Sequence, residues 1–373
     1  MSQTNQKSGS QSIGQRRWKK FKTIKRGYYS LILLTILYGL SFLLPILVND
    51  KALLVRYNGQ YSFPAFTSLV ASFPLVDQFV SVFQSGESLG QTGNPGQARY
   101  RDLQQQYEQE NGDNFVVMPL YPYGPIEDIT TDGNTAFMEP WSASDGEGPR
   151  IMGTDENGRD VFARMAYGFK VSISFALILV FLEYLIGIPI GGLLGFKSGW
   201  YDLIGQRIIE MWSTLPILFL IIIVVSFIQP SFTLLVLLLA LTAWIPITTY
   251  IRAEFYREKS KDYVAAAISI GVPTWKIMFK HILPNSLVPI ITNFPFAVVA
   301  GITSLVALDF LGFGLPPPTP SWGQMLSSGL QNLTKWWLVF SPMFALFATL
   351  IMIVFIGEAI REAFDPKTFS RLR

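Results

Sequence analysis

VSISFALILVFLEYLIGIPIGGLLGF, from Val171 to Phe196, is the stretch that decides the fold. Glu183 is its only charged residue, and the stretch is longer than the roughly 20 helical residues that cross the core of a bilayer. It therefore predicts a membrane-spanning helix. The composition agrees, because 50% of the 373 residues are hydrophobic and only 15% are charged. We expect an all-α membrane protein.

Other apolar segments lie on both sides of this one. One of them, Leu215 to Ile228, is short and spans a bilayer only if it borrows the preceding turn. The others are Tyr28 to Val48, Phe232 to Ile251, Leu287 to Phe310 and Trp336 to Ile356. The sequence thus predicts six transmembrane helices: a first helix over 28–48 and a five-helix core over 171–357.

Basic residues predict the orientation. The N-terminal tail, 1–27, contains no acidic residue among Arg16, Arg17, Lys19, Lys20, Lys22, Lys25 and Arg26. The positive-inside rule places this tail in the cytoplasm, and the interleaved Trp18, Phe21 and Ile24 indicate an amphipathic helix on membrane lipid. Six crossings then place 49–170 outside, the basic loop 252–285 inside, and the C-terminal tail 358–373 inside.

The segment 49–170 should form a loop-rich extracytoplasmic domain, inserted between the first and second helices. Acidic residues and Gly, Pro and Asn turn signals run through it; the acids include Asp128, Asp132, Glu139, Asp145 and Glu147. Gln104 to Glu110 is suited to a short helix. No periodicity extends far enough to predict a fold.

Several kinds of chemistry are excluded or unsupported. The chain has no Cys and a single His, His281, which excludes disulfides, cysteine nucleophiles, thiolate metal sites and a His cluster, so we expect no redox function and no metal site. No phosphate-binding G-x-x-x-x-G-K-[ST] loop is present, so any ATP binds elsewhere. The net charge of +3 gives no indication of nucleic acid, which we do not expect as a partner.

The loop DYVAAAISIGVPTWKIMFKHILPN, Asp262 to Asn285, carries the functional signal. Asp262 can cap a helix over Tyr263 to Ile270, and Gly271 suits a left-handed stop. Pro273 suits the first turn of a second helix that ends before Pro284.

The first of these helices has an apolar face. Val264, Ala267, Ile268 and Gly271 fall at i, i+3, i+4 and i+7 on a segment with basic residues around it. Two interpretations are open: the helix lies on the inner leaflet, or it docks in a groove of a cytoplasmic protein.

A resemblance favours the second interpretation. Ala265, Ala266, Ala267, Gly271 and Leu283-Pro284 resemble the EAA loop, E-A-A-x3-G-x9-I-x-L-P, of permease subunits of binding-protein-dependent ABC importers. Ala265 stands where that pattern has Glu, and His281 where it has Ile. Ala265 cannot make the contact of the missing Glu.

Other stretches resemble the dipeptide and oligopeptide branch of that family. They are GTDENGRDVFARMAYGFKVS (Gly153 to Ser172) and DFLGFGLPPPTPSWGQML (Asp309 to Leu326). NDKALLVRYNGQYSFP (Asn49 to Pro64) and IGEAIREAFDP (Ile356 to Pro366) are similar to peptide permeases of the microcin C type.

The resemblance implies a type I ABC importer permease in a bacterial inner membrane, moving peptides or peptide-like compounds. It also implies a non-catalytic subunit, with no catalytic residues in this chain. Its implied partners are a second homologous permease subunit, ABC ATPase subunits that bind ATP and Mg, and an extracytoplasmic peptide-binding protein. The implied ATPase-coupling residues are Tyr263, Val264, Ala265, Ala266, Ala267, Ile268, Gly271, Leu283 and Pro284.

Glu183 allows a different hypothesis. An acid in the middle of a membrane helix can serve a substrate pathway, a proton or a partner, although a neutral or helix-paired Glu in the bundle is the favoured interpretation. An ion- or proton-coupled secondary carrier is therefore the alternative function, but we detect no inverted repeat to support it. A membrane-anchored binding module would need only one helix.

Overall fold

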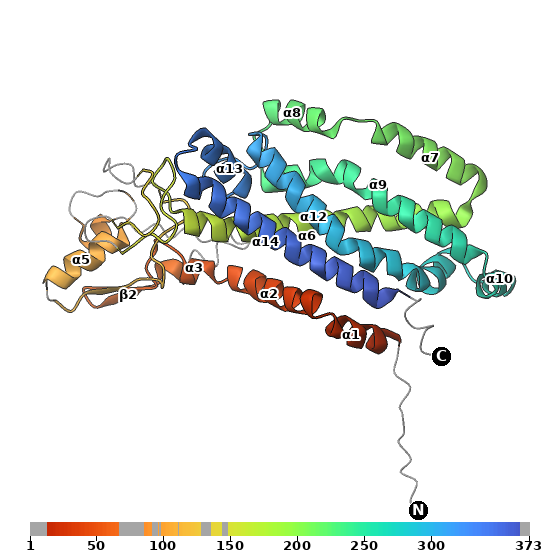
Figure 1. Cartoon of the computed structure of the whole chain (residues 1–373), viewed down its shortest axis with the longest axis horizontal. Helices are drawn as coiled ribbons and strands as arrows, with labels where there is room; N and C mark the ends of the chain where they lie inside the picture. The colour runs from red at the N-terminus through yellow and green to blue at the C-terminus, as the bar shows by residue number, and fades with distance from the viewer. Residues whose placement is uncertain are drawn as a thin grey trace, which may run out of the picture.

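The computed structural model describes residues 13–66, 86–91, 96, 98–110, 112–127, 136–143 and 148–365. Within them, four helical stretches are long and apolar enough to cross a membrane. They are α6 (Val161–Lys197), α9 (Phe232–Lys259), the stretch Thr274–Phe310 that includes α12 (Leu287–Phe310), and α14 (Trp336–Phe364). They run along the long axis of the molecule (Figure 1). The predicted helical membrane class is confirmed.

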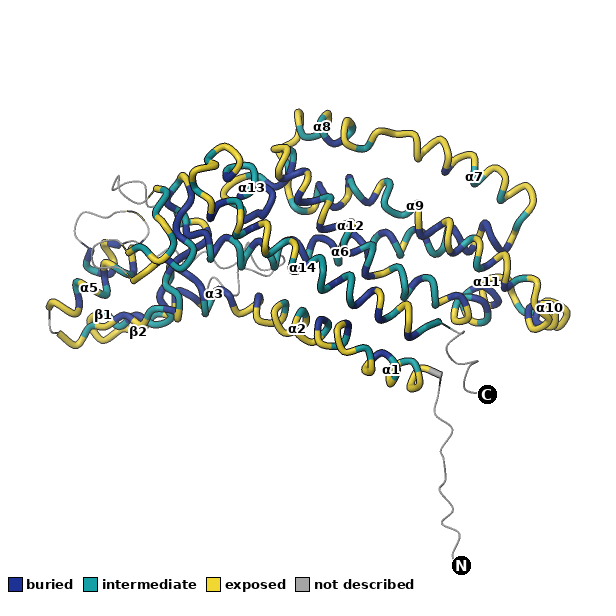
Figure 2. Tube along the Cα trace, viewed as in Figure 1, coloured by how far each residue is buried: buried dark blue, intermediate teal, exposed yellow. Residues whose placement is uncertain are grey.

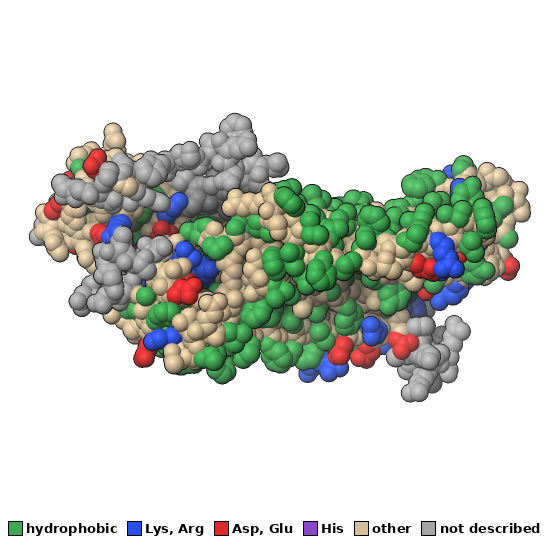
Figure 3. All heavy atoms as spheres, turned by 90° about the horizontal axis from the view of Figure 1, so that it is seen from above, with side chains coloured by type: hydrophobic (Ala, Val, Ile, Leu, Met, Phe, Trp, Pro, Cys, Tyr) green, Lys and Arg blue, Asp and Glu red, His purple; other side chains and the backbone are tan. Residues whose placement is uncertain are grey.

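Hydrophobic side chains cover the middle of this bundle, and charged side chains gather toward its two ends (Figure 3). This is the distribution that a bilayer imposes, because a charged group is costly in the hydrocarbon core and is easily solvated at the interfaces.

Helices α7 (Gly199–Ser213) and α8 (Ile217–Phe227) form a bent pair that supplies a fifth candidate span. They meet at 62°. Asp202 on α7 accepts a bidentate bond from Arg252 on α9, with oxygen–nitrogen distances of 2.5 and 2.6 Å. Both helices are largely exposed (Figure 2), with large apolar side chains among the exposed residues: Ile204, Ile208, Met211, Phe219 and Phe227.

The predicted first helix, Tyr28 to Val48, is interrupted. Helix α2 (Lys25–Ser41) ends before Pro45, and the short α3 (Leu44–Leu47) follows with Pro45 in its first turn, where proline is tolerated. The 17 residues of α2 span about 26 Å, slightly less than a bilayer core. Before it, α1 (Ile13–Thr23) packs Phe21 against Ala359 and Ala363 of α14.

Helix α6 begins at Val161, ten residues before the predicted start at Val171, because Asp160 caps it. The Asp160 carboxylate accepts a hydrogen bond from the Ala163 amide at 2.8 Å, which satisfies one of the open amides of the first turn.

Glycines let α6 approach α9 closely. A Cβ at Gly187, Gly191 or Gly195 would overlap Ile247 or the backbone carbonyls of α9. Helices that lack side chains on the facing stripe bring their backbones together, which is the usual way to pack helices inside lipid.

The largest core lies between α6, α12, α14 and α13 (Trp322–Gln331). Trp322 is 1% exposed, and its indole N–H donates to the Met165 carbonyl at 2.9 Å. Trp337 donates in the same way to Thr154 at 3.1 Å. These two bonds tie α13 and the segment before α6 to the bundle.

The segment between α3 and α6 adds a small sheet that the sequence did not predict. Strands β1 (Leu54–Tyr57), β2 (Gln60–Ser62) and β3 (Phe115–Val117) form an antiparallel sheet in the order β2-β1-β3, with Val55 opposite Ser62 and Val116. The 3₁₀ turn η1 (Glu87–Leu89) and α5 (Tyr100–Glu110) pack on it. The predicted Gln104 to Glu110 helix is confirmed within α5. Of the predicted acidic residues, Asp128, Asp132, Asp145 and Glu147 lie outside the described residues.

Candidate functional site

The functional loop joins α9 to α12 at one end of the molecule. It contains α10 (Asp262–Ser269), α11 (Thr274–Lys276), a π-helical turn (Ile277–Ile282) and a 3₁₀ turn (Leu283–Ser286). Figure 1 shows α10 at the same end as α1, whereas α5 and β2 lie at the opposite end. The loop is thus separated from the sheet-bearing segment by the length of the bundle.

One side of α10 is fastened to the bundle. Val264 is 0% exposed and Ala267 is 6% exposed. They pack in a core whose other members come from α6, α9, the π turn and α12: Phe196, Ile247, Ile251, Phe255, Ile277, Met278, Ile282 and Ile290. Because this contact is internal, α10 is joined directly to the membrane helices.

The opposite side of α10 is open. We define the exposed tip as Ala265, Ala266, Ile268, Ile270 and Trp275. Ile270 is 80% exposed and Trp275 is 67% exposed, although both are large and apolar. The predicted apolar face is therefore split. Val264 and Ala267 point into the chain's own core, whereas Ile268 and Gly271 are exposed. Large apolar side chains that are exposed so close together in the chain are typical of an interaction surface.

The local helix signals were partly right. Gly271 has φ of +74°, the predicted left-handed stop. The predicted cap was wrong by one residue, because Lys261 occupies the N-cap position and Asp262 is the first helical residue. Pro273 likewise precedes α11 as its N-cap and does not lie in its first turn.

The second helix was predicted to end before Pro284, and this prediction was wrong. It widens into the π turn, tightens into the 3₁₀ turn and continues into α12. Pro284 lies in the first turn of the 3₁₀ segment, where its missing N–H costs little. Pro284 is exposed and Leu283 is half-buried, so both lie where the loop joins the bundle.

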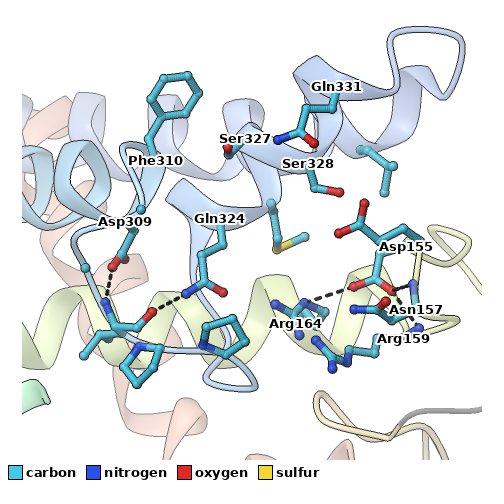
Figure 4. Close-up of a pocket in the computed structure, with 18 of the residues that line it drawn as sticks. Asp155, Asn157, Arg159, Arg164, Asp309, Phe310, Gln324, Ser327, Ser328 and Gln331 are labelled. Atoms are coloured by element: carbon cyan, nitrogen blue, oxygen red, sulfur yellow. Dashed lines mark hydrogen bonds and ion pairs between the residues drawn. The ribbon is translucent and has the colours of Figure 1, made fainter. Parts of the chain in front are cut away.

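A second site lies at the other end of the bundle. A cavity of about 460 Å³ is lined by the segment before α6, the end of α8, the end of α12, and α13 (Figure 4). Residues from the stretches Gly153 to Ser172 and Asp309 to Leu326, far apart in sequence, meet at it. They include Asp155, Arg159, Arg164, Asp309 and Gln324.

The polar groups of this cavity are mostly engaged within the chain. Arg164 Nε lies 3.5 Å from Asp155 Oδ2, and burial raises the pKa of the Asp155 carboxyl above its ordinary value. Asp309 accepts hydrogen bonds from the Leu315 amide at 2.7 Å and from Ser321 Oγ at 2.5 Å. Gln324 donates to the Leu315 carbonyl (Figure 4). The cavity is therefore polar and rigidly framed.

Glu183 lies buried on α6, 8% exposed and four residues before Gly187. It is far along the helix from the cavity-lining Arg164. A pathway or partner role for Glu183 remains a prediction.

Comparison with known proteins places this chain in a family. The profile described as "Binding-protein-dependent transport system inner membrane component" matches residues 187–370. The "Inner membrane ABC transporter permease protein YejE" of Escherichia coli (strain K12) is 38% identical over 354 residues, which cover 95% of this chain and 97% of the relative. This chain belongs to the family of inner-membrane components of binding-protein-dependent transport systems.

Other members of the family are also similar. The "Peptidoglycan transport system permease protein YejE" of Agrobacterium fabrum (strain C58 / ATCC 33970) is 35% identical, over 95% of this chain and 93% of the relative. The "Dipeptide transport system permease protein DppC" of Bacillus subtilis (strain 168) is 35% identical, over 68% of this chain and 78% of the relative.

Family membership confirms the predicted class, a multi-pass inner-membrane permease subunit that is not itself an enzyme. It implies an ATPase and a substrate-binding protein as partners. The secondary carrier is not favoured.

Proposed function

We propose that this chain forms half of the channel of an ATP-driven importer for peptides or peptide-like compounds. A second homologous permease subunit forms the other half, and ATP and Mg bind in the partner ATPase subunits. The names of relatives that transport dipeptides or peptidoglycan support this substrate class. The observation that carries the proposal is the exposed apolar tip at the end of the bundle.

The proposed topology has six crossings of the type I kind. The α2–α3 pair forms the first crossing and the bent α7–α8 pair the third. The N-terminal tail, the loop 252–285 and the tail 358–373 face the cytoplasm, and 49–170 forms the inserted extracytoplasmic domain. Placement of α10 and α1 at one end, with the sheet at the other, supports this arrangement (Figure 1).

The remaining partners follow from the same topology. The extracytoplasmic peptide-binding protein docks at the outer end, near the 460 Å³ cavity, which opens between segments of the family motifs. Lipid and the second permease subunit cover the exposed apolar faces of α7 and α8, and α1 lies on the inner leaflet.

In the proposed mechanism, α10 transmits motion of the ATPase to the membrane helices through direct packing. The exposed tip docks in the ATPase, and Val264 and Ala267 join α10 to the membrane core. ATP binding changes the ATPase arrangement, and a ligand that favours one of two arrangements shifts the equilibrium of everything rigidly attached to it. Ala265 and Ala266 allow a close approach of the two surfaces.

Replacing an exposed tip residue tests the contact. Ile268→Asp places a charge in a docked apolar surface, so we expect at least about ten-fold less ATPase to co-purify with the chain from detergent. Leu330→Asp is the matched control: Leu330 on α13 is 50% exposed and Ile268 is 51% exposed. Undiminished co-purification with Ile268→Asp, or equal loss with Leu330→Asp, would overturn the proposal.

A further inference from the structure

A buried carboxylate lies at the joint between α9 and α10. Glu258 is in the last turn of α9, and its side chain is 2% exposed. Its Oε1 accepts a hydrogen bond from Lys261 Nζ at 2.6 Å and lies 3.8 Å from Arg257 Nη2. Its Oε2 accepts a hydrogen bond from the Tyr263 hydroxyl at 2.9 Å. Both carboxylate oxygens are therefore engaged.

This position is unfavourable for a carboxylate that has no partners. Burial removes hydration, and the C-terminal end of a helix carries partial negative charge that repels an anion. The bonds from Lys261 and Tyr263 offset these costs. Both donors belong to the start of α10. The buried Glu258 carboxylate therefore keeps these two hydrogen bonds only while α10 stays in its observed place.

The link continues to α12. The Tyr263 hydroxyl also lies 3.4 Å from Asn285 Nδ2, which donates to the His281 carbonyl at 2.9 Å. Asn285 belongs to the 3₁₀ turn that leads into α12. Glu258, Tyr263 and Asn285 thus connect the end of α9, the start of α10 and the start of α12.

Apolar packing alone does not fix the direction of α10. Val264 and Ala267 hold it by non-directional contact, whereas hydrogen bonds set distances and angles. The loop lacks the Glu of the EAA pattern, because Ala265 stands there. Lys261 and Arg257 lie beside a different acid, Glu258, which is seven residues before Ala265.

We propose that Glu258 is a positioning residue that holds α10 in a fixed orientation against α9 and α12, so that motion of the ATPase reaches both helices. This inference rests on the proposed coupling function. Without Glu258, α10 still carries its exposed tip but turns relative to the bundle, and the ATPase stays bound while transport is lost.

Spin labels can measure that orientation directly, because the chain has no Cys. We would label Ser269→Cys on α10 and Leu287→Cys at the start of α12, both exposed, in the full importer with a cysteine-free ATPase. When Glu258 is unsubstituted, the two labels should give one narrow inter-label distance both with and without ATP. Glu258→Ala should lose that narrow peak in both conditions.

Uptake provides the second readout. With a labelled trialanine probe in proteoliposomes, Glu258→Ala and Tyr263→Phe should each reduce ATP-driven uptake about ten-fold, the equivalent of one lost charged hydrogen bond. Glu258→Gln, which keeps an acceptor for Tyr263 but loses the charge, should fall between. Glu254→Ala is the matched control: Glu254 pairs with Arg257 on the same helix at 2.5 Å, and its removal leaves the bonds from Lys261 and Tyr263 to Glu258 in place.

The outcomes separate the two proposals. A narrow inter-label distance in both Glu258→Ala and Tyr263→Phe would overturn the positioning role. The role would also be overturned if Glu254→Ala changed the distance and the uptake as much as Glu258→Ala does. If the chain unsubstituted at Glu258 binds no ATPase, the coupling function itself is wrong. Since Glu258→Gln and Tyr263→Phe are near-isosteric, they decide the matter even if Glu258→Ala fails to fold.

Discussion

Gly271 ends α10 in the left-handed backbone conformation, which residues with side chains rarely adopt. Its φ is +74°, and a Cβ there would meet nothing within 4 Å, so the requirement comes from the backbone and not from crowding. Asn adopts this region more readily than other residues with side chains, and β-branched residues adopt it least.

This difference gives a prediction at the residue scale. Gly271→Val should destabilise the turn by about 1–3 kcal/mol and lower ATP-driven uptake several-fold, while the chain still inserts. Gly271→Asn should retain most of the uptake. Uptake in proteoliposomes, normalised to inserted protein, provides the measurement. If Gly271→Val and Gly271→Asn give the same uptake, the left-handed turn does not determine coupling.

At the scale of elements, the packing of α6 on α9 depends on missing side chains. The Gly191 position faces the Thr248 carbonyl with no room for a methyl group. Gly39 on α2 is in the opposite situation, since a Cβ there would meet nothing within 4 Å. The two positions therefore form a natural pair for comparison.

We expect Gly191→Ala to destabilise the bundle by about 1–3 kcal/mol, because the helices must separate. Gly39→Ala should be neutral or stabilising, since Ala favours helix by about 1 kcal/mol over Gly. Thermal unfolding of the purified chain in detergent measures both. A midpoint for Gly191→Ala at or above that of the unsubstituted chain would show that the close approach is not needed.

The sequence predicted the elements whose residue pattern extends over many positions. The apolar runs over α6, α9, α12 and α14 located the four candidate spans, and the alanine-rich loop located α10. The β1–β2 hairpin was missed although its two-residue turn, Asn58-Gly59, is a strong hairpin signal; both residues have positive φ, of 48° and 78°. Strands of three or four residues show too little alternation to detect.

Burial within the loop could not be predicted either. Periodicity places Val264, Ala267, Ile268 and Gly271 on one stripe, but it does not say how much of that stripe the bundle covers. The role of Glu258 depends on tertiary contacts with Tyr263 and Lys261, and its position in the sequence looks like an ordinary charged helix end. Only the fold distinguishes these cases.

At the scale of the whole molecule, the two candidate sites are separated by the length of the bundle. Helix α13, which lines the cavity, and the small sheet lie toward one end, and α10 with its exposed tip lies at the other (Figure 1). Helices α9 and α12 run between them and meet the loop at Glu258 and Asn285. Coupling through these two helices requires that the exposed tip touch the ATPase from the cytoplasmic side.

Photo-crosslinking from the tip tests this requirement most directly. A benzophenone attached to Ile268→Cys, in a chain with no other Cys, should form an adduct with the ATPase subunit in the assembled importer. The same probe on Leu330→Cys should form none. An adduct from Leu330→Cys alone, or labelling of Ile268→Cys by an impermeant reagent added outside intact cells, would contradict the account.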